Sequence, residues 1–502
     1  MIKEKYDVII IGSGAGGGTV AEYLSRFADR GISILIIEGG PYWDKEKFNQ
    51  NERDMSKLYF NRGAVFSKEM NIGVAAAKAV GGSTVVYTGV SFRPPEDVLE
   101  RWRKEYGLKF LTEDFVNSRL DEMEKMINVH EIPPEYDNDN NILFKKGCEK
   151  LGIKVKRLRI NIRDCKGQGF CNLGCTEGAK QGTHVVQIPL ALSRGVDITY
   201  NSWVNYIDRE TVYFTVNPAP PWTRKNVLPE GSYSVKGKVI IIAAGALNTP
   251  ALFLRSRKAI GIKNSNIGRY ITLHPAYNLN GVYPEPIKNY RGHPKSFYVD
   301  QFSESENYYL ETSFYFPGVT AKNNPGFGKI HEEVMKKYNH MMSILILSHD
   351  PAEKHNRIEI DRRGTMRLRY RVNPSIRKSL AKAIIRAGEI FFAAGCTEML
   401  LPGSRKLPLT RGDSSNLEKL ITEKNLIFEK YPLSSAHPQG GARMGEDPEF
   451  SVVSPEGTLW GTDNIYVADA SLFPTSVKVN PYETVMLMAR YVGEQVKKSL
   501  IG

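Results

Sequence analysis

Short, uninterrupted apolar runs mark the start of the chain. Residues 8–11 read Val-Ile-Ile-Ile, residues 34–37 read Ile-Leu-Ile-Ile, and residues 19–27 between them have apolar side chains at helical spacing. Strands buried on both faces read as continuous β-branched runs, so the pattern predicts strand, helix, strand with the two strands parallel, which is half of a Rossmann fold. Residues 238–250 repeat the strand and the turn and begin a second helix, and are predicted to join the same sheet.

Alternating patterns replace these runs between about residues 283 and 427. Residues 357–370 read as two alternating strands around Arg-Arg-Gly-Thr, which indicates a hairpin, and residues 375–394 read as one long amphipathic helix. The predicted fold class is therefore α/β, with a Rossmann-type domain and an inserted antiparallel-sheet-plus-helices domain. The predicted domains are residues 1–100, 180–282 and 428–502 for the cofactor, residues 101–179 as a helical and cysteine-containing insertion, and residues 283–427 for the substrate.

A glycine pattern follows the first strand directly. Gly12, Gly14 and Gly17 occupy G-x-G-x-x-G positions, where the missing side chains let the backbone approach a pyrophosphate at the helix N-terminus. Glu38 ends the second strand, 21 residues after Gly17 (38 − 17), where a carboxylate binds the ribose hydroxyls of an adenosine and disfavours a 2′-phosphate. The pattern predicts a dinucleotide site for NAD or FAD; the alternative is a glycine-rich turn that binds nothing.

Composition is typical of globular proteins. The chain has 502 residues, of which 41% are hydrophobic and 25% charged, enough for a large core and two domains. The net charge is +13, but no stretch combines a basic stripe with interleaved aromatics, so we expect a solvated lysine-rich surface and no nucleic-acid binding. Apolar runs are too short to cross a bilayer, and the first strand leaves no room for a signal peptide. We expect a cytoplasmic protein, unless a partner subunit carries it to a membrane.

Three further segments follow in a recognisable order. Residues 80–84 read Val-Gly-Gly-Ser-Thr, residues 437–445 read His-Pro-Gln-Gly-Gly-Ala-Arg-Met-Gly, and residues 464–484 contain a strand followed by Asn-Pro-Tyr-Glu. Together with the N-terminal unit, this order resembles the glucose-methanol-choline (GMC) oxidoreductase family of FAD enzymes. The resemblance covers nearly the whole chain and is weakest between residues 283 and 427. Within the family, the sequences of these motifs resemble those of cholesterol oxidases, long-chain alcohol oxidases and the large subunits of bacterial FAD-dependent sugar dehydrogenases.

The resemblance implies FAD rather than NAD as the cofactor. It also implies that His437 is the catalytic histidine and that Asn480 is its partner. Tyr87 is a departure, because many family members have an asparagine near the flavin at this position. The residues that the resemblance places against FAD are Gly12, Gly14, Gly17, Glu38, Gly81, Gly82, Ser83, Thr84, Ala244, Gly245, Asp469, Ala470, Asn480 and Pro481.

Alcohol oxidation explains why these two side-chain types belong together. The reaction removes the hydroxyl proton and a hydride, and a neutral imidazole can accept the proton near neutral pH. A carboxamide beside it can hold the substrate oxygen without adding charge. The structural alternatives are that His437 caps the glycine turn at residues 440–441 and that Asn480 is a turn residue. His274, in Leu-His-Pro, is a second candidate for lining the cavity.

Three cysteines form a local cluster in the sequence. Cys165, Cys171 and Cys175 have the spacing C-x5-C-x3-C with glycines between them, which suits an iron–sulfur cluster, and three ligands favour the 3Fe-4S type. Cys148 is a candidate fourth ligand. The spacing resembles the sugar dehydrogenases, in which such a cluster relays electrons, whereas the following residues resemble long-chain alcohol oxidases. Inert buried thiols, a disulfide and a zinc site are the alternatives.

The expected function is an FAD-dependent alcohol or sugar dehydrogenase. Its electrons are expected to pass through the cluster to an acceptor other than oxygen, either an electron-acceptor protein or a small partner subunit. Without the cluster, an oxidase that produces hydrogen peroxide is favoured. A flavin-containing hydroxynitrile lyase and a non-catalytic nucleotide-binding scaffold are also candidate functions. Sugars, sterols and fatty alcohols all remain candidate substrates.

Overall fold

Among the residues that the structure describes, seven strands form the first sheet, which contains the predicted strand–helix–strand unit. The computed structural model describes residues 2–63, 65–324, 326–402, 407–428 and 432–501. The strands of the first sheet are β1 (Lys5–Ile11), β2 (Ile34–Ile37), β8 (Asp197–Thr199), β9 (Ser202–Ile207), β10 (Thr211–Val216), β11 (Gly231–Ile242) and β21 (Ile465–Val467). β1 lies between β2 and β11 and is parallel to both, which confirms the predicted Rossmann-type unit. Its last four residues are buried, as the continuous apolar run requires.

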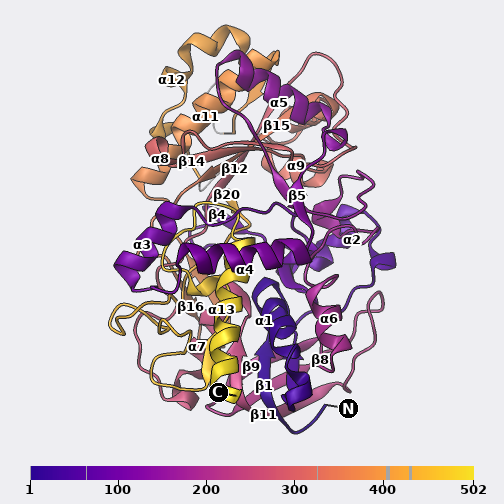
Figure 1. Cartoon of the computed structure of the whole chain (residues 1–502). Helices are drawn as coiled ribbons and strands as arrows, with labels where there is room; N and C mark the ends of the chain where they lie inside the picture. Colours follow the sequence, from indigo (N-terminus) through magenta and orange to yellow (C-terminus); the bar gives the residue numbers. More distant parts are fainter. Residues whose placement is uncertain (1, 64, 325, 403–406, 429–431, 502) are drawn as a thin grey trace.

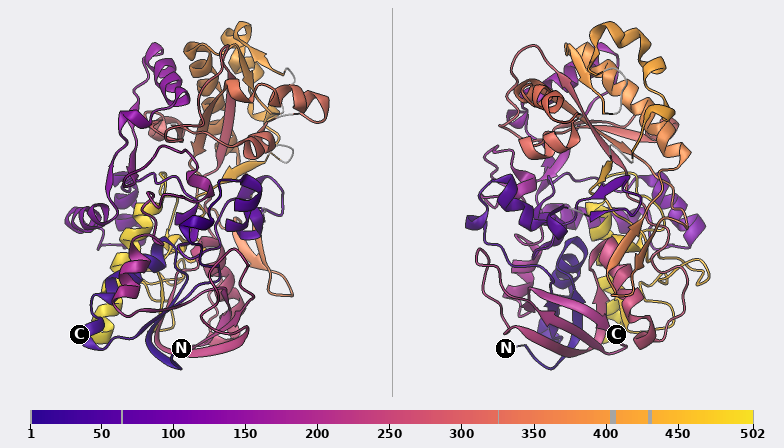
Figure 2. Two further views of the ribbon diagram at one scale, coloured as in Figure 1. Left: turned by 90° about the vertical axis from the view of Figure 1, so that its right-hand side faces the viewer. Right: turned by 180° about the vertical axis from the view of Figure 1, so that it is seen from behind.

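Helices pack around this sheet and against one another. They are α1 (Ala15–Ser25), α6 (Gln187–Ser193), α7 (Gly245–Ile260) and α13 (Tyr482–Ile501), together with α3 (Glu96–Tyr106) and α4 (Glu113–Met126). α1 follows β1 directly and contacts α6 and α13, and α4 contacts α13 (Figure 1). Both termini lie at the end of the molecule that this domain forms (Figure 2). No helix among the described residues is long and apolar enough to cross a membrane.

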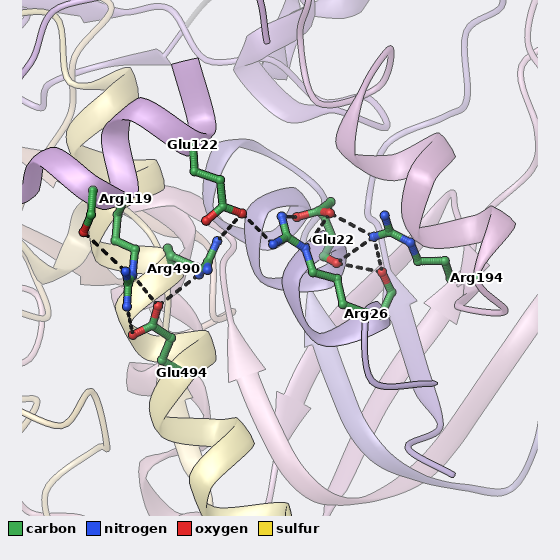
Figure 3. A network of polar contacts seen from close by, with 9 residues as sticks. Glu22, Arg26, Arg119, Glu122, Arg194, Arg490 and Glu494 are labelled. Carbon is green, nitrogen blue, oxygen red and sulfur yellow. Dashed lines mark hydrogen bonds and ion pairs between the residues drawn. The ribbon is translucent and has the colours of Figure 1, made fainter. Parts of the chain in front are cut away.

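An ionic network fixes α1 to its neighbouring helices (Figure 3). The buried carboxylate of Glu22 forms ion pairs with Arg26 and Arg194, each at 2.8 Å. Arg26 also forms an ion pair with Glu122 at 2.5 Å. Arg490 of α13 bonds to the same Glu122 oxygen at 3.0 Å. Because α1 begins at the glycine turn, these contacts hold the predicted cofactor site in position.

In the described part of the chain, ten strands form the second sheet. They are β3 (Val65–Phe66), β4 (Ile72–Val74), β6 (Lys156–Arg157), β12 (Ala276–Val282), β13 (Phe297–Val299), β14 (Tyr308–Thr312), β15 (Met341–Ser348), β18 (Glu398–Leu400), β19 (Leu409–Thr410) and β20 (Leu433–Ser435). One face is apolar and packs on α5 (Asp139–Lys150) and α11 (Pro374–Ala394), with Leu279 and Ile344 fully buried. The sheet lies between these helices and the first domain (Figures 1 and 2).

The second sheet does not follow the predicted boundary at residue 283. β12 begins at Ala276 and pairs along its whole length with β15, from Ala276 opposite Leu347 to Val282 opposite Met341. β4 and β20 join the sheet from parts of the chain that were assigned to the cofactor domain. The predicted boundary marked the loss of glycine-rich turns, whereas strand pairing over long sequence distances leaves no local pattern.

The predicted hairpin and long helix are both present. β16 (Arg357–Ile360) pairs antiparallel with β17 (Met366–Arg369), and α11 ends at Ala394 as predicted. β5 (Val129–Glu131) pairs with β7 (Arg159–Asn161) in a small separate sheet. The remaining short helices are α2 (Glu52–Met55), α8 (Ser303–Glu306), α9 (Pro317–Asn323), α10 (Lys329–Met335) and α12 (Leu417–Leu420).

Candidate active site

The turn between β1 and α1 is the first part of the predicted cofactor site. Gly14 is the N-cap of α1 and offers no side chain to the first amides of the helix, whose N–H groups suit an anion. Gly12 has a φ of +101°, and a Cβ built there would lie 2.3 Å from the Ala243 carbonyl oxygen. A Cβ on Gly17 would lie 2.0 Å from the Gly12 carbonyl oxygen. Only glycine fits at these positions, and the resulting cradle suits a pyrophosphate.

The second glycine turn lies against the first. A Cβ on Gly82 would lie 2.7 Å from the Cα of Gly14, and the amide of Gly81 donates to Ser13 Oγ at 2.9 Å. Thr84 Oγ1 donates to the Gly81 carbonyl at 2.7 Å and so closes the turn. The two turns, 68 positions apart in the sequence, therefore form one surface. Ser83 lies in this turn and accepts a hydrogen bond from the amide of Ala77 at 3.1 Å.

Glu38 lies beside this surface, at the end of β2. Its carboxylate accepts hydrogen bonds from the Ser13 amide (2.9 Å), the Ser13 hydroxyl (2.7 Å) and the Gly40 amide (2.7 Å). Burial raises the pKa of the Glu38 carboxyl, and the hydrogen bonds from Ser13 and Gly40 oppose the rise. A carboxylate has about four lone-pair sites, so Glu38 can still accept from ribose hydroxyls. The donor set thus fits the adenosine end of a dinucleotide.

Asp469 ties the C-terminal strand to the start of α7. Its carboxylate accepts from the Gly245 amide at 2.8 Å, from Thr249 Oγ1 at 2.5 Å and from the Ser471 amide at 2.8 Å. Burial raises the pKa of the Asp469 carboxyl, against the effect of these donors. Ala244 is the N-cap residue of α7 and donates its amide to Thr249 Oγ1 at 3.2 Å. The second predicted strand–turn–helix therefore meets the C-terminal segment here.

His437 lies on the loop after β20 and is anchored to the C-terminal segment. The Gln439 side chain donates to the His437 carbonyl at 3.2 Å and accepts from the Val477 amide at 2.9 Å. The Gly440 amide donates to the Ala470 carbonyl at 2.9 Å. Gln439 thereby joins the loop of His437 to the segment that leads into Asn480. Asn480 is buried and directly precedes Pro481 and α13.

Two more histidines extend inward from His437. Nδ1 of His437 lies 3.0 Å from Nδ1 of His274, and the His274 ring lies 5.6 Å from the ring of His349. Burial lowers the pKa of His274 to about 3 and lowers the pKa values of His437 and His349 well below their usual range. All three imidazoles are therefore neutral at neutral pH, and a neutral imidazole can accept a proton.

The cysteine segment gives the predicted iron–sulfur cluster no support. Among the described residues, no group of three or more His, Cys, Asp or Glu side chains is arranged to hold a metal ion. Cys165, Cys171 and Cys175 are each partly exposed. Cys148, the candidate fourth ligand, gains no support either, because its thiol is fully buried in the apolar core that α5 forms with the second sheet.

A buried lysine attaches the cysteine loop to the second glycine turn. Lys180 Nζ donates to the carbonyls of Val85 (2.7 Å), Tyr87 (2.7 Å) and Cys171 (2.6 Å). Burial lowers the pKa of Lys180 to about 8. The hydroxyl of Tyr87 accepts from the Asn161 side chain at 2.6 Å, and its ring lies edge-on to Tyr482 at 5.0 Å. Tyr87 stands at the position where the resemblance expects an asparagine, and its hydroxyl and its ring both have partners here.

Sequence patterns did not point to several residues that shape the site. Ser13 bridges Glu38 to the second glycine turn, but it occupies a variable position of the G-x-G-x-x-G pattern. Gln439 bonds to Val477, 38 positions later in the chain, and His349 lies against His274, 75 positions earlier. The only local indication was the polar Gln between His437 and the glycine turn.

Family models and curated relatives match most of this chain. Two family models described as GMC oxidoreductase match residues 55–276 and residues 329–489. A GMC-type oxidoreductase of Mycobacterium tuberculosis, described as uncharacterized, is 30% identical over 505 residues, covering 99% of this chain and 76% of that protein. The long-chain-alcohol oxidase FAO4A of Arabidopsis thaliana is also 30% identical and covers 99% of this chain and 69% of its own length.

Solved structures share the fold. The crystal structure of pyridoxine 4-oxidase from Mesorbium loti superposes with a TM-score of 0.73 at 17% identity, covering 98% of this chain and 99% of that one. Formate oxidase from Aspergillus oryzae, studied for its FAD modification, has a TM-score of 0.72 at 13% identity over 100% of this chain and 99% of that one. The two glycine turns, Glu38 and Asp469 fit the FAD that these proteins imply. The chain therefore belongs to the GMC oxidoreductase family, whose members are FAD-dependent oxidoreductases acting on alcohol-type substrates.

Proposed function

We propose that this protein oxidises an alcohol group to a carbonyl, with His437 as the general base and Asn480 as the group that orients the substrate oxygen. The observation that carries the proposal is the Gln439 bridge, which joins the His437 loop to the segment leading into Asn480. Proton removal from an alcohol requires a neutral base and a group that orients the oxygen, and a neutral, half-buried histidine and a buried carboxamide are side chains of these two kinds.

The cofactor residues are those of the two glycine turns and the ends of β2 and β21. The N-terminus of α1 would bind the pyrophosphate, Glu38 the ribose, and the Gly245–Asp469 junction the flavin end. FAD, when bound, supplies the hydride acceptor.

The proton goes to the side of His437 that faces away from His274. Nδ1 of His437 is occupied by the contact with His274, so Nε2 is the nitrogen that accepts the hydroxyl proton. Asn480 holds the substrate oxygen by its amide and adds no charge to the buried site. The resulting imidazolium gives its proton to solvent after the carbonyl product leaves.

For the electron acceptor we propose molecular oxygen, with hydrogen peroxide as the product. Relatives whose names state an activity include long-chain-alcohol oxidases and a cholesterol oxidase. The second candidate is a dehydrogenase that uses an iron–sulfur cluster on Cys165, Cys171 and Cys175. One observation favours it, namely that Lys180 holds the cysteine loop against Tyr87, next to the second glycine turn.

A substrate panel tests the function. Purified holoenzyme is mixed anaerobically with sugars, sterols and primary and secondary alcohols, and bleaching of the flavin absorbance is recorded. We expect at least one alcohol to bleach the flavin and oxygen to restore its colour with one peroxide formed per carbonyl. A flavin that no alcohol bleaches would contradict the proposal and favour a lyase. Iron content and electron paramagnetic spectra of anaerobically purified protein, together with slow reoxidation by oxygen, would favour the dehydrogenase.

A further inference from the structure

A hydrogen bond joins the fully buried His274 to the half-buried His437, and the proposed function assigns His274 no role of its own. Nδ1 of His274 and Nδ1 of His437 are 3.0 Å apart, and His274 is fully buried. Two neutral imidazoles that meet through Nδ1 atoms must share one proton, so one ring donates and the other accepts. If His437 donates the Nδ1 proton, its Nε2 carries the free lone pair. If His274 donates, the proton of neutral His437 is on Nε2.

The backbone of His274 is held in an unusual conformation that aims its ring. Its φ is +49°, a left-handed value that costs a non-glycine residue of order 1 kcal/mol. Asp350 opposes this cost, because its carboxylate accepts from the amides of Leu273 at 2.7 Å and His274 at 2.9 Å. Tyr370 donates its hydroxyl to the same carboxylate at 2.7 Å. Asp350, which follows β15, and Tyr370, which follows β17, therefore hold the backbone of His274 in this conformation.

Charged and titratable groups surround the pair on several sides. The ion pair of Lys295 and Glu311 is buried and comes from the loop before β13 and from β14. His349 faces His274 with a ring distance of 5.6 Å, and Asp350 lies under its backbone. The positive charge of Lys295 disfavours a second positive charge on His274. His274 therefore acts as a neutral hydrogen-bonding group and not as a proton store.

We infer that His274 is a positioning residue that accepts the Nδ1–H of His437, which fixes the tautomer of His437 and leaves its Nε2 as the base. The reverse arrangement would place the proton of neutral His437 on Nε2, and no base would face the alcohol. An acceptor at Nδ1 also stabilises the imidazolium that forms when His437 takes the proton. This inference rests on the proposed function.

Two substitutions at His274 separate the hydrogen bond from the backbone strain. His274→Gly keeps the left-handed backbone without strain but removes the acceptor. His274→Asn also tolerates a positive φ, and its side-chain oxygen reaches about as far as Nδ1. We expect His274→Gly to lower kcat and the rate of flavin reduction by about 100-fold with KM within about threefold of wild type. We expect His274→Asn to recover at least about a tenth of the wild-type rate.

A spectroscopic readout makes the test independent of turnover. Nitrogen-15 spectra of histidine-labelled holoenzyme distinguish a protonated Nδ1 from a protonated Nε2, and His437→Gln identifies the signal. We expect protonated Nδ1 in the wild type and a mixture of tautomers in His274→Gly. His331→Gln is the matched control, because His331 lies on α10 at the surface of the second domain, and it should leave the His437 signal unchanged.

The outcomes separate this inference from the proposed function. A protonated Nε2 on His437 in the wild type, or wild-type kcat in a folded His274→Gly, would overturn the role of His274 alone. Full flavin reduction by alcohol in His437→Ala would overturn the base role itself. Bound FAD in each variant, measured by absorbance, shows that the fold is kept.

Discussion

The two sheets of this protein differ in how their strands come together. The first sheet takes its central strands from two compact strand–turn–helix units, and the turns between them form the cofactor cradle. The second sheet takes strands from residues 65–74, 156–157, 276–348, 398–410 and 433–435, and it supplies the histidines. The core of the cofactor site, the turn at Gly12 together with Glu38, is therefore built from one local unit, whereas the histidines are brought together by long-range strand pairing. Changes in this local unit should act on FAD binding, and changes around the histidines on turnover with FAD still bound.

The largest effect on FAD binding is expected at Gly12. A Cβ there would lie 2.3 Å from the Ala243 carbonyl oxygen, so Gly12→Ala should weaken FAD binding by roughly 100-fold or more. Titration of apoprotein with FAD, followed by flavin fluorescence, measures the change. Gly31→Ala is the control, because Gly31 also has a positive φ of +82° but no described atom lies within 4 Å of its Cβ. Equal losses in both variants would show strain, and not the cradle, as the cause.

Glu22 tests whether the ionic network holds α1. Glu22→Gln leaves Arg26 and Arg194 without their buried anion and should lower the free energy of unfolding by about 3 kcal/mol. Thermal unfolding followed by flavin release measures this loss. Glu105→Gln removes a surface carboxylate that pairs with Arg101, and should cost less than about 1 kcal/mol. Similar losses in the two variants would contradict the special role of the network.

Tyr370→Phe tests the region around the histidines. Tyr370→Phe removes the hydrogen bond to Asp350, which holds the backbone of His274, and should cost about 1 kcal/mol. We expect kcat to fall by roughly threefold to tenfold, with FAD affinity unchanged. Steady-state kinetics and FAD titration on the same preparation separate the two effects. Loss of FAD with unchanged turnover per bound flavin would reverse the assignment of the two regions.

The smallest effect is expected from pH. Burial lowers the pKa of His437 well below the usual value of about 6.5. The active base is the neutral form, which is present above the pKa, so acid is needed to inactivate it. We expect the rate of flavin reduction to stay level from about pH 6.5 to 8.5 and to fall only at lower pH. A rate that rises steeply between pH 7 and 8 would contradict a neutral buried histidine.

The sequence patterns predicted the cofactor unit more fully than the region around the histidines. The run at residues 8–11, Gly12 and Glu38 lie within one local unit, and the structure places them as the pattern predicts. The pairing of β12 with β15 was not predicted, because the two strands are separated by a long stretch of chain that leaves no local pattern. His349 and Asp350 gave no sequence signal, since their roles depend on contacts with His274. Cysteine spacing predicted a cluster, but spacing alone does not show how the thiols are oriented.

Single-turnover flavin reduction in His437→Ala tests the central claim most directly. The variant and the wild type, both loaded with FAD, are mixed anaerobically with the best alcohol of the panel. His331→Gln, on α10 at the surface of the second domain, serves as the matched control. We expect the rate in His437→Ala to fall by about a thousandfold while FAD stays bound and the control is unchanged. Reduction in His437→Ala at the wild-type rate would show that His437 is not the base.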